Sequence, residues 1–240
     1  MTARATDYLI DVRGLDAFYG AAQVLFDVSL QIAAGEAVAL VGRNGAGKST
    51  TLKAIIGLVE HRAQHLSFDG TDIARLPTHA IARLGLGYVP EERRIFTDLS
   101  VAENLEVGRL PVRDGRAPWT VERLYQIFPN LAEMAGRSAG RMSGGEQQML
   151  AIARTLMGNP HAVLLDEPSE GLSPLIVEQM AGAILRMKRE GIAVLLSEQN
   201  LTFAAEIASR AILLETGSIV FDGAIAELAA RQKAEDVSVR

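Results

Sequence analysis

The sequence contains no cysteine, which excludes disulfide bonds, thiolate metal sites and cysteine nucleophiles together. Lysine is also scarce, with 4 lysines beside 20 arginines, so the place of each lysine is informative. The formal net charge is 24 − 29 = −5. A chain of this charge has no bulk electrostatic attraction to nucleic acid, and we expect no nucleic-acid partner.

Long apolar runs are absent as well. The longest stretches, such as 37–41 and 192–196, fall far below the roughly 18–20 residues needed to span a bilayer. The first 14 residues have no apolar core of the kind found in signal peptides. We therefore expect a chain that is soluble by itself and reaches a membrane only through a partner.

The patterns that are present predict an α/β fold. Residues 8–14 and 26–33 alternate apolar and polar side chains, as half-buried antiparallel strands do. Residues 36–42 form a continuous apolar run that ends in glycine, which is typical of a strand buried on both faces. Beyond residue 160, apolar strands alternate with helices: strands at 161–167, 191–198, 211–215 and 218–223, helices at 175–190 and 201–210. Such alternation favours a parallel sheet.

The middle of the chain differs, because residues 101–159 carry mostly helical patterns. This helical block lies between two α/β portions. The predicted architecture is a single domain over residues 1–240, with a mainly parallel core sheet, an N-terminal antiparallel β portion and a helical subdomain inserted at about 98–160.

The segment GRNGAGKST (42–50) fits the phosphate-binding pattern G-x-x-x-x-G-K-[ST], and a strand precedes it while a helix follows. Glycines let backbone N–H groups curl around phosphate oxygens at a helix N-terminus. Lys48 can reach the β- and γ-phosphates, and Ser49 can ligate Mg²⁺. The alternative is a glycine-rich turn without a ligand. The predicted nucleotide contacts are Gly42, Arg43, Asn44, Gly45, Ala46, Gly47, Lys48, Ser49 and Thr50.

Two adjacent carboxylates end the apolar strand at 161–167. Asp166 can hold the water shell of Mg²⁺, and Glu167 can polarise an attacking water. Acidic residues at strand ends are common. This pair therefore indicates a catalytic site only in combination with the phosphate-binding loop earlier in the chain.

The segment MSGGEQQ (142–148) opens a helix. Ser143 is a good N-cap, and Glu146 three residues later completes a capping box. The segment is therefore either simply a well-capped helix or a second phosphate-binding helix terminus, with Gly144 and Gly145 allowing close approach.

The order of these motifs resembles the ATP-binding subunit of an ABC transporter, a P-loop NTPase, over about residues 8–228. Three segments are similar to the ATPases of branched-chain amino acid importers: YVPEERRIF (88–96), LLDEPSEGLSP (164–174) and LLSEQN (195–200). A closely similar group of ATPases serves urea and short-chain amides.

The resemblance implies a head-to-tail pair of ATPase subunits, identical or different. ATP then lies between the P-loop of one subunit and the segment Ser143, Gly144, Gly145 and Glu146 of the other. Tyr19 matches the aromatic residue that stacks on adenine, with a rim tyrosine packed on the first sheet as the alternative.

Three positions depart from the common family pattern. Glu91 stands where a glutamine usually faces the metal site, Gln199 stands where a histidine usually contacts the γ-phosphate, and Ser173 stands where an aspartate is usual. The implied catalytic set is Lys48, Glu167 and Gln199, and the implied metal-site residues are Ser49, Asp166 and Glu91. Gln199 could instead only cap the helix near Leu201.

The implied function is Mg²⁺-dependent ATP hydrolysis that powers an ABC importer, for branched-chain or related amino acids. The chain would sit on the cytoplasmic face of the membrane, bound to two permease subunits. A periplasmic or extracellular solute-binding protein would be an indirect partner. The alternatives are an importer of urea or amides, a soluble ABC ATPase of translation or DNA repair, and an ATP-binding regulatory module without turnover.

Overall fold

The computed structural model describes residues 8–113 and 117–238. Its N-terminal part is an antiparallel sheet in the order β2-β1-β5-β6, with β4 paired to β1. This sheet confirms the antiparallel strands that the N-terminal alternation predicts. Its strands are β1 (Ile10–Tyr19), β2 (Ala22–Ile32), β4 (Glu60–Arg62), β5 (His65–Phe68) and β6 (Thr71–Asp72).

The second sheet has the order β11-β10-β3-β9-β8-β7. Neighbouring strands are parallel except β10 and β11, which form an antiparallel hairpin. The mainly parallel core sheet is thereby confirmed. Its strands are β3 (Ala37–Val41), β7 (Leu86–Val89), β8 (Ala162–Asp166), β9 (Ala193–Glu198), β10 (Arg210–Glu215) and β11 (Ser218–Ala224).

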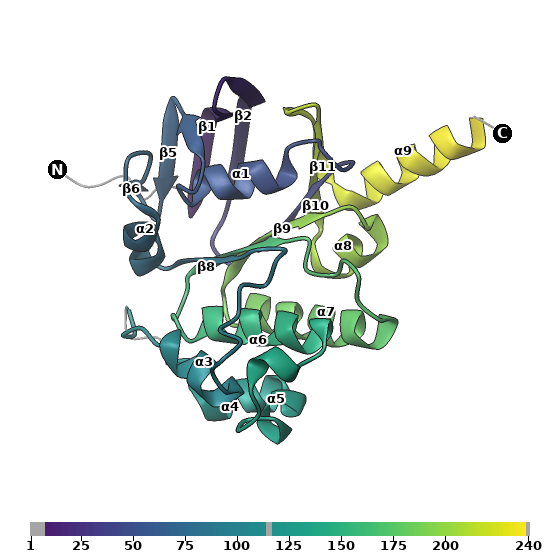
Figure 1. Ribbon diagram of the computed structural model, residues 1–240. Coiled ribbons are helices and arrows are strands. Elements are labelled where there is room, and N and C mark those ends of the chain that lie inside the picture. The colour runs from purple at the N-terminus through teal and green to yellow at the C-terminus, as the bar shows by residue number, and fades with distance from the viewer. Residues whose placement is uncertain (1–7, 114–116, 239–240) are drawn as a thin grey trace.

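The parallel sheet divides the apolar interior into two cores. Along β3, Val38 and Leu40 face the core shared with the N-terminal sheet, while Ala39 and Val41 face the other core. This follows from the two-residue period of a strand. Helices α1 (Lys48–Ile55) and α2 (Thr78–Leu84) lie on the first side, and α6 (Gly144–Leu156), α7 (Pro174–Arg189) and α8 (Leu201–Ile207) lie on the second (Figure 1).

Between β7 and β8 the described chain is helical, and this part lies below the parallel sheet in Figure 1. Its buried residues Leu105, Leu124 and Phe128 belong to the same core as Val163 and Leu165 of β8. The elements here, before α6, are α3 (Val101–Val107), α4 (Val121–Ile127), α5 (Pro129–Glu133) and the 3₁₀ turn η1 (Ala139–Arg141).

The last helix, α9 (Ile225–Ser238), extends away from the body of the molecule (Figure 1). Among the helices of residues 8–113 and 117–238, not one has the length and apolar character needed to cross a bilayer.

Candidate active site

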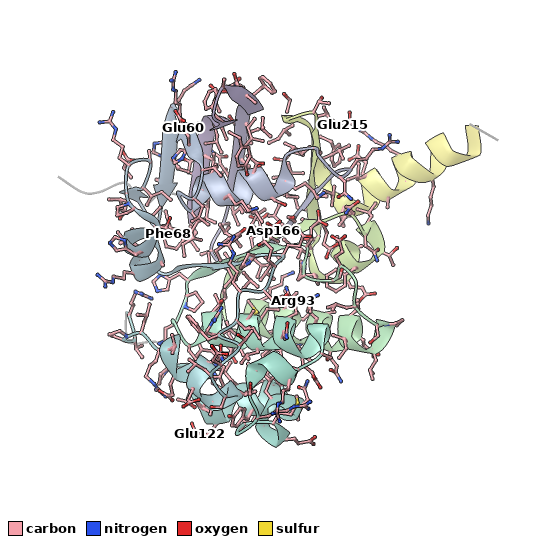
Figure 2. The ribbon with its side chains drawn as sticks, in the orientation of Figure 1. Glu60, Phe68, Arg93, Glu122, Asp166 and Glu215 are labelled. Atoms are coloured by element: carbon pink, nitrogen blue, oxygen red, sulfur yellow. The ribbon has the colours of Figure 1, made fainter. Side chains whose placement is uncertain are left out.

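The candidate catalytic residues meet at the carboxyl ends of β3, β8 and β9, which are neighbours in the parallel sheet. The P-loop follows β3, Asp166 ends β8, and Gln199 follows β9. Parallel strands present their carboxyl ends at one edge, which is where α/β sheets bind ligands. Figure 2 shows Asp166 near the centre of the molecule, at this edge.

The P-loop folds as a tight turn that starts α1 at Lys48. Gly47 caps the helix with a left-handed φ of 107°. A Cβ at Gly47 would lie 2.7 Å from the Cδ2 atom of Leu25 in β2, so glycine is required both for conformation and for space. Arg43 and the loop tip are exposed, while Ser49 is half-buried beside the buried Lys48.

Lys48 is buried and fully engaged within the chain. Its Nζ atom donates to the carbonyl oxygens of Gly42, at 3.0 Å, and Arg43, at 3.3 Å. It also lies 2.9 Å from Oε1 of Glu167, and the two side chains are only 3% and 8% exposed. The predicted phosphate-binding cation and the predicted water-polarising carboxylate thus form a buried ion pair.

Glu167 is held from three sides. Gln199 donates from Nε2 to Oε2 of Glu167 at 3.0 Å, opposite the ion pair with Lys48. Burial raises the pKa of Glu167, but hydrogen bonds from Glu170, Lys48 and Gln199 outweigh it and hold the pKa below its ordinary value. Glu167 is therefore ionised at neutral pH.

Glu170 is a neighbour of Glu167 whose own pKa is raised. Its hydrogen bond with Glu167, together with the negative charge of Glu167, raises the pKa of Glu170 to about 7. The negative charge of Glu91 also raises the pKa of Glu170. The exposed Glu91 is therefore close enough to this site to act on it electrostatically.

The alternative role of Gln199 as a helix cap is wrong. Asn200 caps α8, because its side-chain oxygen accepts from the backbone N–H groups of Thr202, at 3.0 Å, and Phe203, at 3.1 Å. The Gln199 amide is directed to Glu167 instead.

Asp166 is completely buried, and each of its carboxylate oxygens accepts one hydrogen bond from a hydroxyl. Ser197 Oγ donates to Oδ1 at 2.9 Å, and Tyr88 Oη donates to Oδ2 at 3.1 Å. In the part of the chain that the structure describes, Asp166 has no ion pair. Neutral donors leave its charge in place, so the site fits a cation.

The described residues contain no group of three or more His, Cys, Asp or Glu side chains that could hold a metal ion. A site with few protein ligands fits Mg²⁺, which keeps several waters and takes phosphate oxygens as ligands. Mg²⁺ would be held by the Ser49 hydroxyl and by Asp166 through water. The metal-site role of Glu91 stays a prediction.

The capping box at Ser143 is confirmed. The Ser143 N–H donates to Oε2 of Glu146 at 2.6 Å, and the Glu146 N–H donates to Oγ of Ser143 at 3.4 Å. The two glycines are tightly placed: a Cβ at Gly144 would meet the guanidinium of Arg93 at 2.7 Å, and one at Gly145 would meet Ile176 at 2.7 Å. Arg93, labelled in Figure 2, therefore lies against this helix N-terminus.

Comparison with known proteins agrees with these motifs. Residues 25–170 match the family model for ABC transporters. The chain is 42% identical over 219 residues to the high-affinity branched-chain amino acid transport ATP-binding protein BraG of Pseudomonas aeruginosa, covering 91% of this chain and 94% of that protein. The chain belongs to the ABC transporter family.

Two further proteins are similar to this ABC transporter chain over most of its length. It is 35% identical over 227 residues to the lipopolysaccharide export system ATP-binding protein LptB of Escherichia coli, covering 91% of this chain and 92% of LptB. A solved structure of an ATP-binding subunit of an ABC transporter superposes with a TM-score of 0.80 at 28% identity, covering 94% and 93% of the two chains. The ABC ATPase fold is confirmed.

Within one ABC chain, the two predicted phosphate-binding features lie apart. Helix α1, which follows the P-loop, packs on one side of the parallel sheet, and α6, which Ser143 caps, packs on the other (Figure 1).

Tyr19 ends β1 and is 50% exposed. It pairs with Ala22 in the hairpin whose second strand also brings Leu25 against Gly47. A cleft of about 870 Å³ lies beside the P-loop, and Tyr19 is not among its lining residues. The cleft is lined by residues 41–46, Gln199, Leu201, residues 213–216, Val220, Phe221, Leu228 and Arg231. Stacking of Tyr19 on adenine stays a prediction.

Sequence reasoning assigned no individual role in this ABC site to Tyr88, Glu170, Ser197 and Arg93, although each lies in one of the three segments that carry the resemblance. A signal existed for Ser197, because a hydroxyl inside the apolar strand 193–198 needs a partner when buried. The other three carry no local pattern that distinguishes them.

Proposed function

We propose that this chain is the ATP-hydrolysing subunit of an ABC importer, with Lys48, Glu167 and Gln199 as its catalytic residues. The observation that carries the proposal is the contact of these three side chains at the carboxyl edge of the parallel sheet. An ionised carboxylate beside a phosphate-binding loop, with an amide at 3.0 Å, is the arrangement that hydrolysis of a phosphoanhydride needs.

In the proposed reaction, the backbone N–H groups of the P-loop and the Lys48 ammonium bind the phosphates of ATP. Glu167 then exchanges its ion pair with Lys48 for a hydrogen bond from the attacking water. Gln199 has one amide donor for a γ-phosphate oxygen and one carbonyl acceptor for that water. Bound Mg²⁺ would neutralise charge on the phosphate oxygens.

We further propose that two ATPase subunits close head to tail over ATP. The packing of α1 and α6 on opposite sides of the sheet supports this, because the backbone amides of Gly144 and Gly145 at the start of α6 can then face a nucleotide on the second subunit. Closure would move the helical subdomain, proposed here as residues 98–160, and the two permeases bound to it. The chain would then be peripheral, on the cytoplasmic face of the membrane.

The proposed cargo is a branched-chain or related amino acid. It is supported by the 42% identity to BraG, a branched-chain amino acid transport protein, against 35% identity to the lipopolysaccharide export protein LptB. An ATPase subunit has little contact with cargo, so an importer of urea or short-chain amides is the second candidate.

The ATPase proposal is tested with Glu167→Gln, which removes water activation and keeps the phosphate-binding loop. We expect this variant to bind Mg·ATP and to elute in gel filtration as a dimer, while ADP leaves it monomeric. Lys48→Ala is the control, and it should stay monomeric with either nucleotide. A monomer under saturating ATP, alone and with its co-purifying ATPase partner, contradicts the proposal.

The cargo proposal is tested on the assembled transporter. Affinity purification of the tagged chain should recover one partner ATPase or a second copy, and two permeases. In vesicles, leucine, isoleucine or valine with the matching solute-binding protein should stimulate ATP hydrolysis, and urea should not. Stimulation by urea or acetamide alone would favour the second candidate.

A further inference from the structure

Tyr88 and Asp166 lie 78 positions apart in the sequence but on adjacent strands, where the Tyr88 hydroxyl donates to Oδ2 of Asp166 at 3.1 Å. On the opposite side of Asp166, strand β9 supplies Ser197, which donates to Oδ1 at 2.9 Å. The carboxylate is thus held at both oxygens, from the two strands that flank β8.

Both donors to Asp166 are neutral hydroxyl groups. A lysine or arginine partner would neutralise the carboxylate, whereas two hydroxyls fix its position and leave its charge. The two hydroxyls reach different oxygens of Asp166, from strands on either side of β8, so they fix the plane of the carboxylate as well as its position. Asp166 is 0% exposed, and bulk water does not supply these hydrogen bonds.

We propose that Tyr88 is a positioning residue, which together with Ser197 fixes the carboxylate plane of Asp166 for a divalent cation that accompanies ATP. This inference rests on the proposed function, because it needs a nucleotide at the P-loop. Tyr88 acts only through Asp166 and does not touch the nucleotide. Outer-shell partners of this kind set the geometry, and hence the affinity, of a metal site.

A purely structural role of Tyr88 and a positioning role lead to different expected results for loss of its hydroxyl. If the Tyr88 hydroxyl only satisfies a buried carboxylate, its loss lowers stability and leaves the metal dependence unchanged. If it orients Asp166, its loss raises the Mg²⁺ concentration needed to form the ternary complex.

The decisive variant is Tyr88→Phe, which keeps the ring that packs on the core beneath the N-terminal sheet. Tyr125→Phe is the matched control, since among the described residues the buried Tyr125 hydroxyl has no hydrogen-bond partner. Equilibrium binding of a fluorescent ATP analogue is followed while Mg²⁺ is titrated, and again in EDTA. Mn²⁺ bound with ATP is followed in parallel by electron paramagnetic resonance.

We expect Tyr88→Phe to raise the Mg²⁺ midpoint about tenfold and to broaden the Mn²⁺ spectrum, with nucleotide affinity in EDTA unchanged. Tyr125→Phe should match the wild type. In a double-mutant cycle, Tyr88→Phe should raise the Mg²⁺ midpoint more in the Ser197→Ala background than alone. The reason is that neither hydroxyl then remains to hold the Asp166 carboxylate.

An unchanged Mg²⁺ midpoint in Tyr88→Phe, or an equal loss of affinity in EDTA and in Mg²⁺, would overturn the positioning role. Failure of the wild-type chain to bind Mg·ATP would instead overturn the proposed function, and the positioning role with it. The two failures are therefore distinguishable in one titration.

Discussion

Lys48 Nζ and Glu167 Oε1 lie 2.9 Å apart in a buried ion pair that joins the start of α1 to the end of β8. In the proposed reaction ATP separates them, because the three N–H donors of the Lys48 ammonium are already used by Glu167 and by the carbonyl oxygens of Gly42 and Arg43. Activation of Glu167 would thereby be linked to occupation of the P-loop.

Lys48→Ala should abolish nucleotide binding, because it removes the buried ammonium at the start of α1. We expect a loss of at least about 100-fold in affinity for ATP, the equivalent of two charge-assisted contacts. Lys53→Ala, in the last turn of the same helix, is the control. The measurement is equilibrium binding together with the ATPase rate, and normal turnover of an assembled Lys48→Ala complex would contradict the assignment.

Gln199→Ala should lower kcat by about tenfold or more and leave ATP affinity nearly unchanged, because its contacts matter most as charge redistributes in the transition state. Gln199→His should retain part of the activity and add an inflection at about pH 6–7. Both are measured as steady-state ATPase rate against pH, in a complex whose partner subunit has its own glutamate disabled.

The control for this experiment is the neighbouring residue. Asn200→Ala removes the N-cap of α8 and should cost about 1 kcal/mol of stability without lowering kcat. If Gln199→Ala behaves like Asn200→Ala, Gln199 has only a structural role.

Glu170 gives the protein a pH-dependent stability. Because its pKa in the folded state is raised to about 7, the folded state binds more protons than the unfolded state between the ordinary glutamate pKa and that value. Its contribution to stability is therefore present at about pH 4–5 and is lost as the pH rises through about 7. The Tm of wild type minus that of Glu170→Gln should fall steadily from pH 5 to pH 8.

Glu167→Gln tests why the pKa of Glu170 is raised, because the hydrogen bond with Glu167 and the charge of Glu167 are the main causes. In that background, Glu170→Gln should shift Tm by the same amount at every pH. A pH-dependent difference that persists without the Glu167 carboxylate would assign the effect to another group.

Two glycine substitutions should change stability in opposite directions. Gly145→Ala pushes a methyl group to within 2.7 Å of the branched side chain of Ile176 and should cost about 1–3 kcal/mol. Gly182→Ala, in the interior of α7 with nothing within 4 Å of the added Cβ, should gain about 0.5–1 kcal/mol. Urea unfolding measures both, and a stabilised Gly145→Ala would mean that Ile176 moves aside.

The sequence alone determined the parts of this ABC chain that depend on neighbours along the chain. Three such parts are each contained in fewer than ten residues: the P-loop, the capping box at Ser143, and the strand that ends at Asp166, directly before Glu167. Backbone propensity, glycine geometry and strand periodicity act over that range, so their patterns are readable without coordinates. Their order along the chain then carried the resemblance to the family.

Only the tertiary structure decided which side chains touch. Tyr88 reaches Asp166 because β7 and β8 pair in one particular register, and no property of residues 86–89 specifies that register. Gln199 and Asn200 are adjacent polar residues of similar chemistry, so either could cap α8 on sequence grounds. The turn after β9 directs the first to Glu167 and the second to the helix, because side-chain direction is set by backbone dihedral angles that the packed sheet imposes.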